Sequence, residues 1–323
     1  GPAFAAELVR GGRSPRCRRP RQGSAVSGFS ADWLALREPA DKVARDRSPI
    51  GTLVGNWAVQ RATAVQDPSP LRIVDLGSGS GANLRYLAPR LGRAQSWRLV
   101  ENDAALLAHS PRVIRDWARA HSWTFAADAE NLYIESPGFS ATVAHQPLDL
   151  ATQLERLTLR DTDLVTASAL LDLVSHAWID SLLAGCHSAG CAVLLALSYD
   201  GRITWRPGLA FDDTITAVLN RHQHGDKGFG PAAGPQAAAY ASERLRHAGY
   251  IVRQGRSDWR LTAADAPLQA VLAKGWAEAA AETAPADSAR IGAWLKQRRA
   301  LIERAACELT VGHVDLFALP RTQ

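Results

Sequence analysis

The sequence has no run of eighteen consecutive apolar residues, so no stretch is long enough to cross a membrane as a helix. Cysteine is scarce: four stand among 323 residues, at positions 17, 186, 191 and 307, without metal-ligand spacing or a disulfide framework. Cys186 and Cys191 flank a turn of small residues, as ordinary buried thiols do in cytosolic proteins. We therefore expect a cytoplasmic protein without a metal site.

The chain also lacks an excess of basic residues outside its N-terminal segment, although its net charge is +5. Residues 1–21 hold six arginines and one acid, Glu7, so the remaining chain is neutral. Proteins that track phosphates usually carry a basic face on their folded part, and the sequence thus argues against a nucleic-acid partner. We interpret residues 1–24 as a disordered basic tail. Its opening Gly1-Pro2 resembles the remnant of a cleaved expression tag, and an organelle transit peptide stays open.

With 46% hydrophobic residues, the chain can bury a full α/β core. Ahead of that core, residues 25–66 predict a helical cap. Residues 31–46 have amphipathic spacing after a plausible N-cap, Ser30, and Pro39 should break or restart this helix. A second helix should span 49–65. These helices could cover a ligand site as a lid, with Arg37 and Asp41 either touching ligand or forming a solvated face.

The most informative stretch runs from residue 71 to 91. Residues 71–76 are a short apolar run typical of a buried parallel strand, and residues 82–91 have helical spacing. Gly77, Gly79 and Gly81 lie between them. Without Cβ atoms they allow positive φ angles and let a ligand press against the backbone where a helix begins. The stretch predicts a loop that binds a nucleotide-like cofactor.

Asp75 decides between two kinds of cofactor. Gly77, Gly79 and Ala82 satisfy a relaxed dinucleotide fingerprint, which keeps an NAD-dependent oxidoreductase open. A carboxylate just before the loop would repel phosphate, but it suits S-adenosylmethionine, which carries an ammonium and a sulfonium. Residues 74–81, VDLGSGSG, resemble motif I of the class I (Rossmann-like) S-adenosylmethionine-dependent methyltransferases.

The resemblance covers about residues 67–320 and implies an α/β fold. We expect a Rossmann-like, doubly wound, mostly parallel seven-stranded sheet with an antiparallel last strand, formed by residues 67–323. Strands are expected at 97–103, 163–173, 190–205, 250–255 and 312–320, with helices at 267–283 and 287–310. Turn residues 136–138 predict an inserted hairpin that leads into the third strand.

Two acids follow strands at cofactor-like positions. Glu101 lies 20 residues past Gly81, the distance at which a carboxylate reaches the ribose hydroxyls in such units, whereas Asp103 looks like a helix N-cap. For the adenine we choose Asp149, with Leu150 packing beside it, over Asp128. The full set of expected cofactor contacts comprises Asp75, Gly77, Ser78, Gly79, Gly81, Asn83, Glu101, Asp149, Leu150, Ala167, Ser168 and Leu170, and the resemblance places the last three on the wall beside the methyl group.

The acceptor should bind where Tyr199, Asp200 and Arg202 leave the fifth strand, under a glycine-hinged loop of about residues 202–235. We expect His222 to act as a general base with Asp200 orienting or replacing it, if the acceptor arrives protonated. Expected substrate contacts are Tyr199, Arg202, His176, His224 and Lys227. Asp172 and His176, four apart on one predicted helix, could pair on its surface or reach substrate.

Methyl transfer from a sulfonium is an in-line displacement, so the protein mainly aligns the reactants and excludes water. No Asn-Pro-Pro-Tyr-like motif follows the fourth strand, where Ala167-Ser168-Ala169-Leu170 stands instead, and no cysteine is placed for cytosine methylation. We therefore expect a small-molecule acceptor, with S-adenosylhomocysteine as the other product. An RNA methyltransferase acting through the arginine tail and a non-catalytic cofactor-binding module remain alternatives. The oligomeric state is open.

Overall fold

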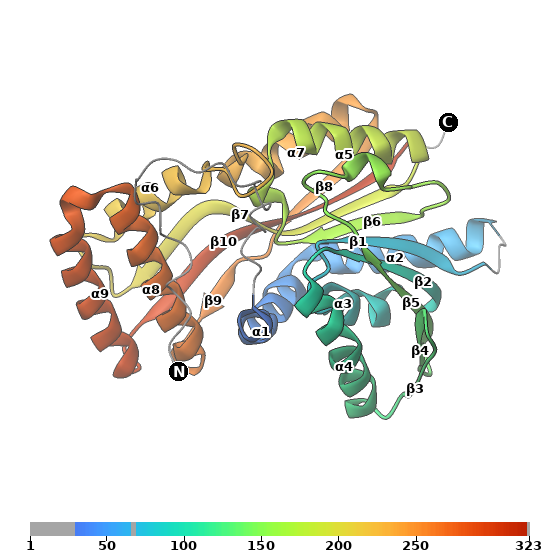
Figure 1. Cartoon of the computed structure of the whole chain (residues 1–323), viewed down its shortest axis with the longest axis horizontal. Coiled ribbons are helices and arrows are strands. Elements are labelled where there is room, and N and C mark those ends of the chain that lie inside the picture. The colour runs from blue at the N-terminus through green and yellow to red at the C-terminus, as the bar shows by residue number, and fades with distance from the viewer. Residues whose placement is uncertain (1–29, 66–68, 322–323) are drawn as a thin grey trace, which may run out of the picture.

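The computed structural model describes residues 30–65 and 69–321 of the chain, shown in Figure 1. The predicted basic tail, residues 1–24, lies outside these residues. Within them, no helix combines the length and the apolar character that a membrane crossing requires.

The helices lie close to where hydrophobic spacing predicts them, with one correction at the first. Ser30 caps that helix as expected, since its hydroxyl accepts a hydrogen bond from the Trp33 amide at 3.1 Å. Pro39 does not break it, because this residue is exposed and removes only one backbone donor from a helix held by its other bonds. The helices are α1 (Ala31–Arg47), α2 (Pro49–Val65), α3 (Ala82–Leu91), α4 (Ala104–Ala120), α5 (His176–Ala189), α6 (Asp212–Gln223), α7 (Ala237–His247), α8 (Ala266–Thr283) and α9 (Ser288–Glu303).

A single mixed sheet forms the centre of the molecule. Its strands are β1 (Leu71–Leu76), β2 (Arg93–Glu101), β3 (Thr124–Ala127), β4 (Asn131–Glu135), β5 (Phe139–Pro147), β6 (Leu164–Ser168), β7 (Ala192–Arg206), β8 (Tyr250–Arg256), β9 (Trp259–Leu261) and β10 (Glu308–Pro320). They are ordered β3-β4-β5-β2-β1-β6-β7-β10-β8, and β9 pairs with β10. The strands β5, β2, β1, β6 and β7 are parallel, whereas β10 is antiparallel to β7, β8 and β9.

This topology confirms the expected Rossmann-like fold and corrects the number of strands. The sheet has ten strands rather than seven. Seven of them, β5-β2-β1-β6-β7-β10-β8, form the doubly wound arrangement with an antiparallel last strand. The other three are β3 and β4, which form the expected inserted hairpin before β5, and the short β9, which the sequence did not predict.

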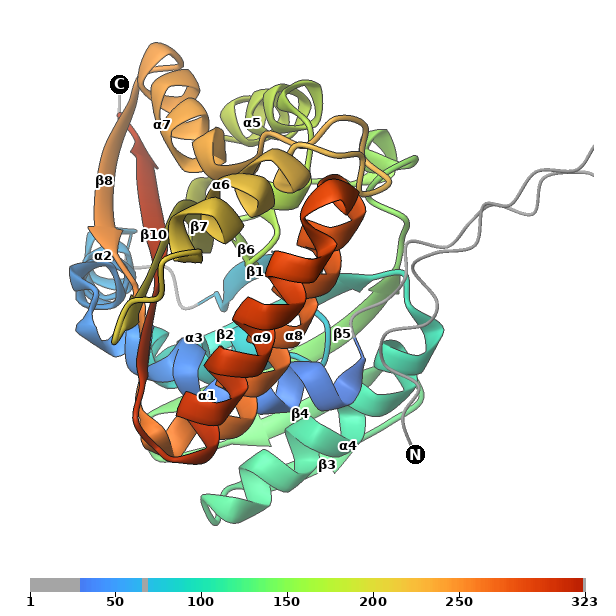
Figure 2. The same cartoon turned by 90° about the vertical axis from the view of Figure 1, so that its left-hand side faces the viewer.

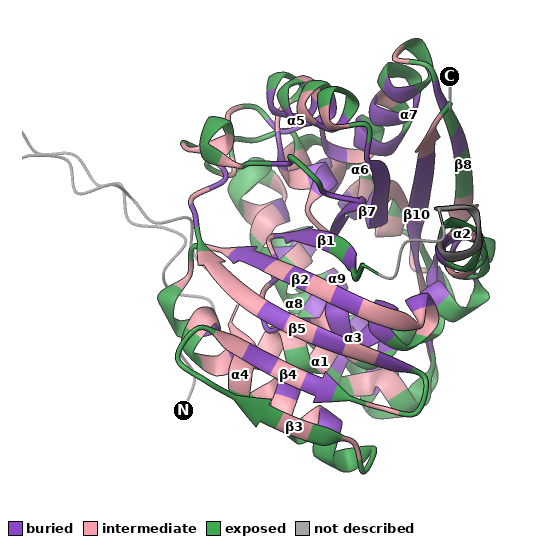
Figure 3. Ribbon diagram, turned by 90° about the vertical axis from the view of Figure 1, so that its right-hand side faces the viewer, coloured by how far each residue is buried: buried purple, intermediate pink, exposed green. Residues whose placement is uncertain are grey.

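Helices cover both faces of the sheet, with α2, α3 and α4 on one side and α5 and α7 on the other (Figure 1). The heptad-like leucines of α3, Leu84 and Leu87, pack with Trp97 of β2 in one core. Leu182 of α5 packs with Val165 of β6 in the other. Burial is greatest in the central strands and falls off toward β3 at the edge (Figure 3). The carboxyl ends of β1 and β6 therefore stand on a fixed framework.

The strands β7 and β10 continue beyond the other strands as an arm (Figure 1). The arm carries α6, α8 and α9, which face the viewer in Figure 2. Here the predicted helix over 287–310 is wrong at its end. Helix α9 stops at Glu303, the backbone turns at Ala305 with φ +53°, and β10 begins at Glu308. Strand β6 is likewise shorter than expected, because a 3₁₀ turn, η2 (Leu171–Leu173), separates it from α5.

Candidate functional site

The glycine loop joins β1 to α3 in the left-handed backbone conformation that its sequence predicts. Gly77, Gly79 and Gly81 have φ angles of +60°, +55° and +83°. Gly79 is restricted further, because a Cβ atom there would lie 3.0 Å from Leu34 Cδ1 of α1. A side chain at this position would thus meet both an unfavourable backbone and the covering helix.

Three backbone amides of this loop are already hydrogen-bonded within the protein. The Ser78 amide donates to the Val100 carbonyl at 3.1 Å, and the Gly81 amide donates to the Ser78 carbonyl at 2.9 Å. The Gly79 amide donates to Glu101 Oε2 at 2.9 Å. These three N–H groups are therefore not free to cradle a phosphate, which is how dinucleotide loops hold their ligand.

Glu101 ends β2 with its side chain fixed against the loop. Its Oε1 accepts hydrogen bonds from the amides of Asn102 at 2.9 Å and Asp103 at 3.1 Å. Asp103 itself caps α4, as expected, by accepting from Ala105 and Leu106. The sequence thus correctly separated the acid that faces the loop from the acid that begins the next helix.

Asp75 lies beneath the loop with part of its hydrogen-bonding capacity unused. Its Oδ1 accepts from Asn83 Nδ2 at 2.7 Å, and Asn83 also donates to Thr166 at 3.1 Å. Burial, and secondarily the charge of Glu101, raises the pKa of Asp75 to about 7. Asp75 Oδ2 and the Ser78 hydroxyl are buried without a partner among the described residues. Buried polar atoms of this kind are costly, and a ligand that bonds them removes the cost.

Helix α1 covers the loop, in the position expected of a lid. Besides the contact of Leu34 with Gly79, Arg45 Nη1 donates to Asn83 Oδ1 at 2.9 Å. Glu38 accepts from Arg85 at 2.6 and 2.9 Å, and Arg85 in turn donates to the Ser80 carbonyl at 2.7 Å. The helix is therefore tied both to the loop backbone and to the residue that holds Asp75.

Arg37 and Asp41 join α1 to the arm. Arg37 donates to Asp41 at 2.9 and 3.1 Å, and Asp41 accepts from the Trp259 indole of β9 at 2.9 Å. The Arg37 guanidinium also lies 5.0 Å from the centroid of that indole ring. These two residues thus serve the packing of α1 in the described structure.

The two candidate adenine acids stand in different places. Asp149 follows β5 directly and accepts from the Ala151 amide at 3.0 Å, next to buried Leu150. The neighbouring Leu148 amide donates to the Glu101 carbonyl at 3.1 Å, so Asp149 shares the carboxyl edge with Glu101. Asp128 instead lies exposed in the β3–β4 turn, where its carboxylate accepts from the Tyr133 hydroxyl at 2.7 Å, and this turn adjoins β4 instead of following β5.

The end of β6 meets the loop through Leu170. Ala167 and Ser168 finish the strand, and a Cβ on Gly77 would lie 3.5 Å from Leu170 Cδ2. The predicted helical pairing of Asp172 with His176 is wrong, because Ser175 caps α5 and only His176 belongs to that helix. Asp172 is buried in η2, whereas His176 is exposed.

Asp200 and Arg202, which the sequence predicts beside the acceptor, form ion pairs within the arm. Arg202 donates through Nε to Asp200 at 2.8 Å and through Nη2 to Asp258 at 2.8 Å. The Tyr199 hydroxyl donates to Asn220 Oδ1 at 2.8 Å. Asp200 and Arg202 therefore neutralise each other in the described structure.

The predicted loop over 202–235 contains helix α6. Its two histidines, His222 and His224, have different partners. His222 lies on α6, 3.9 Å from Glu282 of α8 and 3.5 Å from Lys227. Burial, followed by the charge of Lys227, lowers the pKa of His222. His224 bonds the Ala232 carbonyl through Nδ1 at 3.2 Å. His176 stands apart from both, edge-on to Tyr240 at a centroid distance of 4.4 Å.

Sequence reasoning did not identify the contacts of Leu34 with Gly79 and of Arg45 with Asn83, or the burial of Asp172. Leu34 and Arg45 look like ordinary members of an amphipathic helix, and their partners lie about 40 positions away in the chain. Asp172 was visible only as a helical neighbour of His176. The surroundings of these three residues could therefore be identified only from the folded structure.

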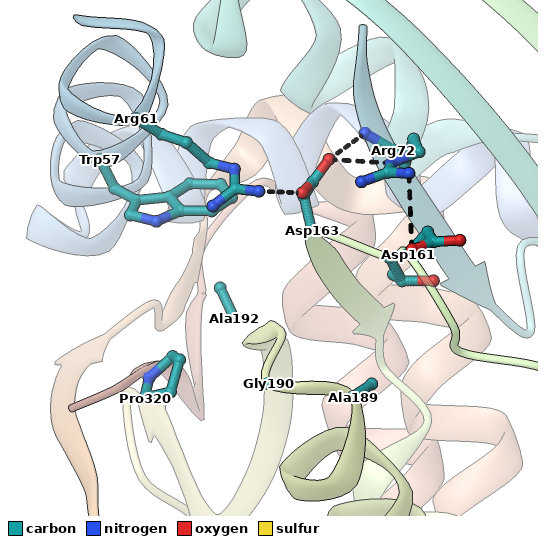
Figure 4. A pocket seen from close by; sticks show the side chains of 10 residues that line it. Trp57, Arg61, Arg72, Asp161, Asp163, Ala189, Gly190, Ala192 and Pro320 are labelled. Atoms are coloured by element: carbon teal, nitrogen blue, oxygen red, sulfur yellow. Dashed lines mark hydrogen bonds and ion pairs between the residues drawn. The ribbon is translucent and has the colours of Figure 1, made fainter. Parts of the chain in front are cut away.

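A cavity of about 260 Å³ lies at the opposite edge of the sheet, near the amino ends of β1, β6 and β7. Its charged groups pair with one another: Arg61 and Arg72 converge on Asp163, and the Arg72 amide donates to that carboxylate at 2.8 Å (Figure 4). This cluster ties α2 to the ends of β1 and β6. The glycine loop is formed at the other ends of these strands, so the cavity is separate from the candidate site.

Comparisons with known proteins find distant similarities among solved structures only. No protein-family model and no curated protein matches the sequence. A SAM-dependent methyltransferase from Thiobacillus denitrificans, solved with S-adenosyl-L-homocysteine, is 15% identical, with 90% of this chain and 99% of that chain covered and a TM-score of 0.38. An O-methyltransferase family protein from Burkholderia thailandensis is 14% identical, with coverage of 69% and 57% and a TM-score of 0.39.

A third similar structure is a phosphoethanolamine N-methyltransferase 2 from Haemonchus contortus, also solved with S-adenosylhomocysteine. It is 12% identical, with 83% of this chain and 53% of that chain covered and a TM-score of 0.36. All three proteins are methyltransferases by name. Because these likenesses are distant, the function proposed below rests on the site itself.

Proposed function

We propose that the chain is an S-adenosylmethionine-dependent methyltransferase that acts on a small-molecule acceptor. One observation supports this most directly: two carboxylates, Asp75 and Glu101, adjoin a glycine loop whose Ser78, Gly79 and Gly81 amides are already bonded. Such a loop repels a pyrophosphate and offers it few donors. It suits a cofactor that brings an ammonium, ribose hydroxyls and no phosphate.

The polar groups beside the loop fit that cofactor. The unpartnered Asp75 Oδ2 and the Ser78 hydroxyl can bond the amino-acid end, and Glu101 can accept from the ribose hydroxyls. Asp149 and Leu150 would lie by the adenine. When bound, the cofactor supplies an activated methyl group. The chain would orient it through these contacts and exclude water with α1, which covers the loop.

The neutral body of the chain supports a small acceptor. Within the described arm, Arg202 is held by Asp200 and Asp258 instead of being left free for a phosphate group. We assign residues 25–66 to the cap and 67–323 to the catalytic domain. His222, Tyr199, His224, Lys227 and His176 stay candidates for the acceptor side.

Calorimetry with S-adenosylhomocysteine and, separately, NADH tests the proposal. The wild type should bind S-adenosylhomocysteine at micromolar concentration and should not bind NADH at the same concentrations. Glu101→Gln should weaken that binding by roughly 10- to 100-fold, because a hydrogen bond to a charged group contributes about 1.5–3 kcal/mol. Glu135→Gln, an exposed acid at the end of β4, is the matched control and should bind like the wild type. NADH binding without S-adenosylhomocysteine binding would refute the proposal.

A further inference from the structure

Asp172 is a buried carboxylate that the fold does not neutralise. Its residue is only 7% exposed, in the η2 turn after β6. Burial raises the pKa of this carboxyl to about 6, although the nearby backbone amides of Asp172 and Tyr199 and the charge of Arg37 act in the lowering direction. Among residues 30–65 and 69–321, no lysine, arginine or histidine forms an ion pair with it. A buried acid without a counter-ion is rare unless a ligand supplies the missing charge.

The cation whose charge acts on Asp172 is already held elsewhere. This cation is Arg37 of α1, which bonds Asp41 at 2.9 and 3.1 Å and lies over the Trp259 ring. Tyr199, the titratable neighbour on β7, gives its hydroxyl to Asn220. No cationic side chain of the described chain is therefore positioned to neutralise Asp172 directly.

Asp172 also lies close to the glycine loop in the fold. Leu170, two residues earlier, packs against Gly77 of the loop, and Tyr199, whose backbone amide influences the Asp172 carboxyl, lies in the middle of β7. Because β1, β6 and β7 are adjacent in the sheet, these contacts set Asp172 between the cofactor loop and the start of the arm. The turn that carries Asp172 would therefore lie beside a cofactor held by the loop.

We propose that Asp172 faces the transferred methyl group, binds a protonated amine acceptor there and removes its proton. This inference rests on the function proposed above. It identifies the acceptor as an amine and assigns the proton transfer to Asp172 instead of His222 or Asp200.

The chemistry balances with these groups alone. The Asp172 carboxylate takes a proton from the ammonium and leaves a neutral amine. The nitrogen lone pair then forms the N–C bond to the methyl group as the C–S bond breaks, and the bonding pair stays on sulfur. The products are a methylated ammonium and S-adenosylhomocysteine, and Asp172 afterwards releases its proton to solvent.

An amine matches this acid better than an alcohol does. An alkylammonium of the lysine type has a pKa near 10.4, roughly four pKa units above that of Asp172. An aliphatic alcohol, whose pKa is close to the value of about 15.7 for water, lies about ten units above it. The positive charge of the amine also provides the counter-ion that the buried carboxylate lacks.

Sinefungin provides a defined probe, because it is an analogue of the cofactor with an amine-bearing carbon in place of the methylated sulfur. Its ammonium should lie against Asp172, whereas neutral S-adenosylhomocysteine has no charge at that point. We expect Asp172→Asn to weaken sinefungin binding about tenfold or more and to change the S-adenosylhomocysteine dissociation constant by less than twofold, both measured by calorimetry. Asp180→Asn, which removes an acid of α5 paired with Arg244, should change neither.

The pattern of the two ligands separates the outcomes. If Asp172→Asn weakens both ligands equally, or neither, Asp172 does not face the methyl position and the inference is wrong. If Asp172→Asn still binds S-adenosylhomocysteine, that variant is folded. If Asp172→Asn does not fold, Asp172→Ser is measured in its place. If the wild type does not bind S-adenosylhomocysteine, the proposed function fails and this inference fails with it.

Discussion

The glycine loop and the arm both gather charged side chains at one edge of the sheet, but they use them differently. In the arm, Arg202 pairs with Asp200 and Asp258, and Arg256 also pairs with Asp258, so the charges cancel within one small region. Under the loop, Asp75 keeps one buried oxygen unbonded. The difference indicates that the loop retains polar capacity for a ligand, whereas the predicted acceptor acids of the arm stabilise the arm.

The two arrangements differ in energy as well as in geometry. Partly exposed ion pairs such as Arg202 with Asp200 contribute about 0–1 kcal/mol each, because solvent screens them. A buried polar atom without a partner costs about 1–3 kcal/mol. Stability alone therefore does not explain Asp75 in its place, and a bound ligand does. The following experiments test whether the loop binds a ligand while the charged residues of the arm only stabilise the fold.

The largest effect is expected at Gly79, where loop and lid meet. Gly79→Ala places a Cβ on a backbone with φ +55° and 3.0 Å from Leu34. A left-handed conformation costs a non-glycine residue roughly 1–2 kcal/mol, and displacing α1 adds to it. We expect a loss of about 2–3 kcal/mol in the free energy of unfolding and at least a tenfold weaker affinity for S-adenosylhomocysteine, measured by urea denaturation and calorimetry.

The matched control is Gly138→Ala, in the β4–β5 turn. A Cβ on Gly138 would meet no atom within 4 Å, and its φ is not in the left-handed region. This variant should keep the stability and affinity of the wild type. Equal effects at the two glycines would show that the loop has no special need for glycine, and the contrast between loop and arm would lose its strongest support.

A second test uses the pH dependence of stability. The pKa of Asp75 is raised to about 7 in the folded protein, so the folded state holds a proton that the unfolded state releases near pH 4. Its stabilising contribution is complete below about pH 4 and is lost as the pH rises through 7. Between pH 5 and pH 8 the wild type should lose on the order of 2–4 kcal/mol more stability than Asp75→Asn, measured by urea denaturation at each pH.

The difference between the two proteins isolates Asp75, because Asp172 and His313 titrate in both. Asp172 has a raised pKa and acts in the same direction, whereas burial lowers the pKa of His313 to about 3 and acts in the opposite direction. Parallel stability curves for the wild type and Asp75→Asn would mean that Asp75 is well solvated. The contrast between an unsatisfied carboxylate under the loop and satisfied carboxylates in the arm would then disappear.

The sequence predicts the loop better than the arm for a physical reason. The loop depends on neighbours in the chain: glycines for positive φ, Asp75 just before them, and Glu101 at the end of the next strand. The arm depends on distant contacts, such as Arg202 with Asp258, 56 positions apart. The continuation of β7 and β10 beyond the sheet carries no local signal. The burial of Asp172 likewise could not be predicted from the sequence, because it follows from the packing of β7 against η2.

The smallest effect is expected for Asp200→Asn in the arm. This variant removes one ion pair of Arg202, and the pair with Asp258 at 2.8 Å remains. The free energy of unfolding should fall by no more than about 1 kcal/mol, and the dissociation constant of S-adenosylhomocysteine should change by less than twofold, measured like those of the Gly79 variant. A weakening of tenfold would place Asp200 within the cofactor site. The arm would then share the binding role that we assign to the loop.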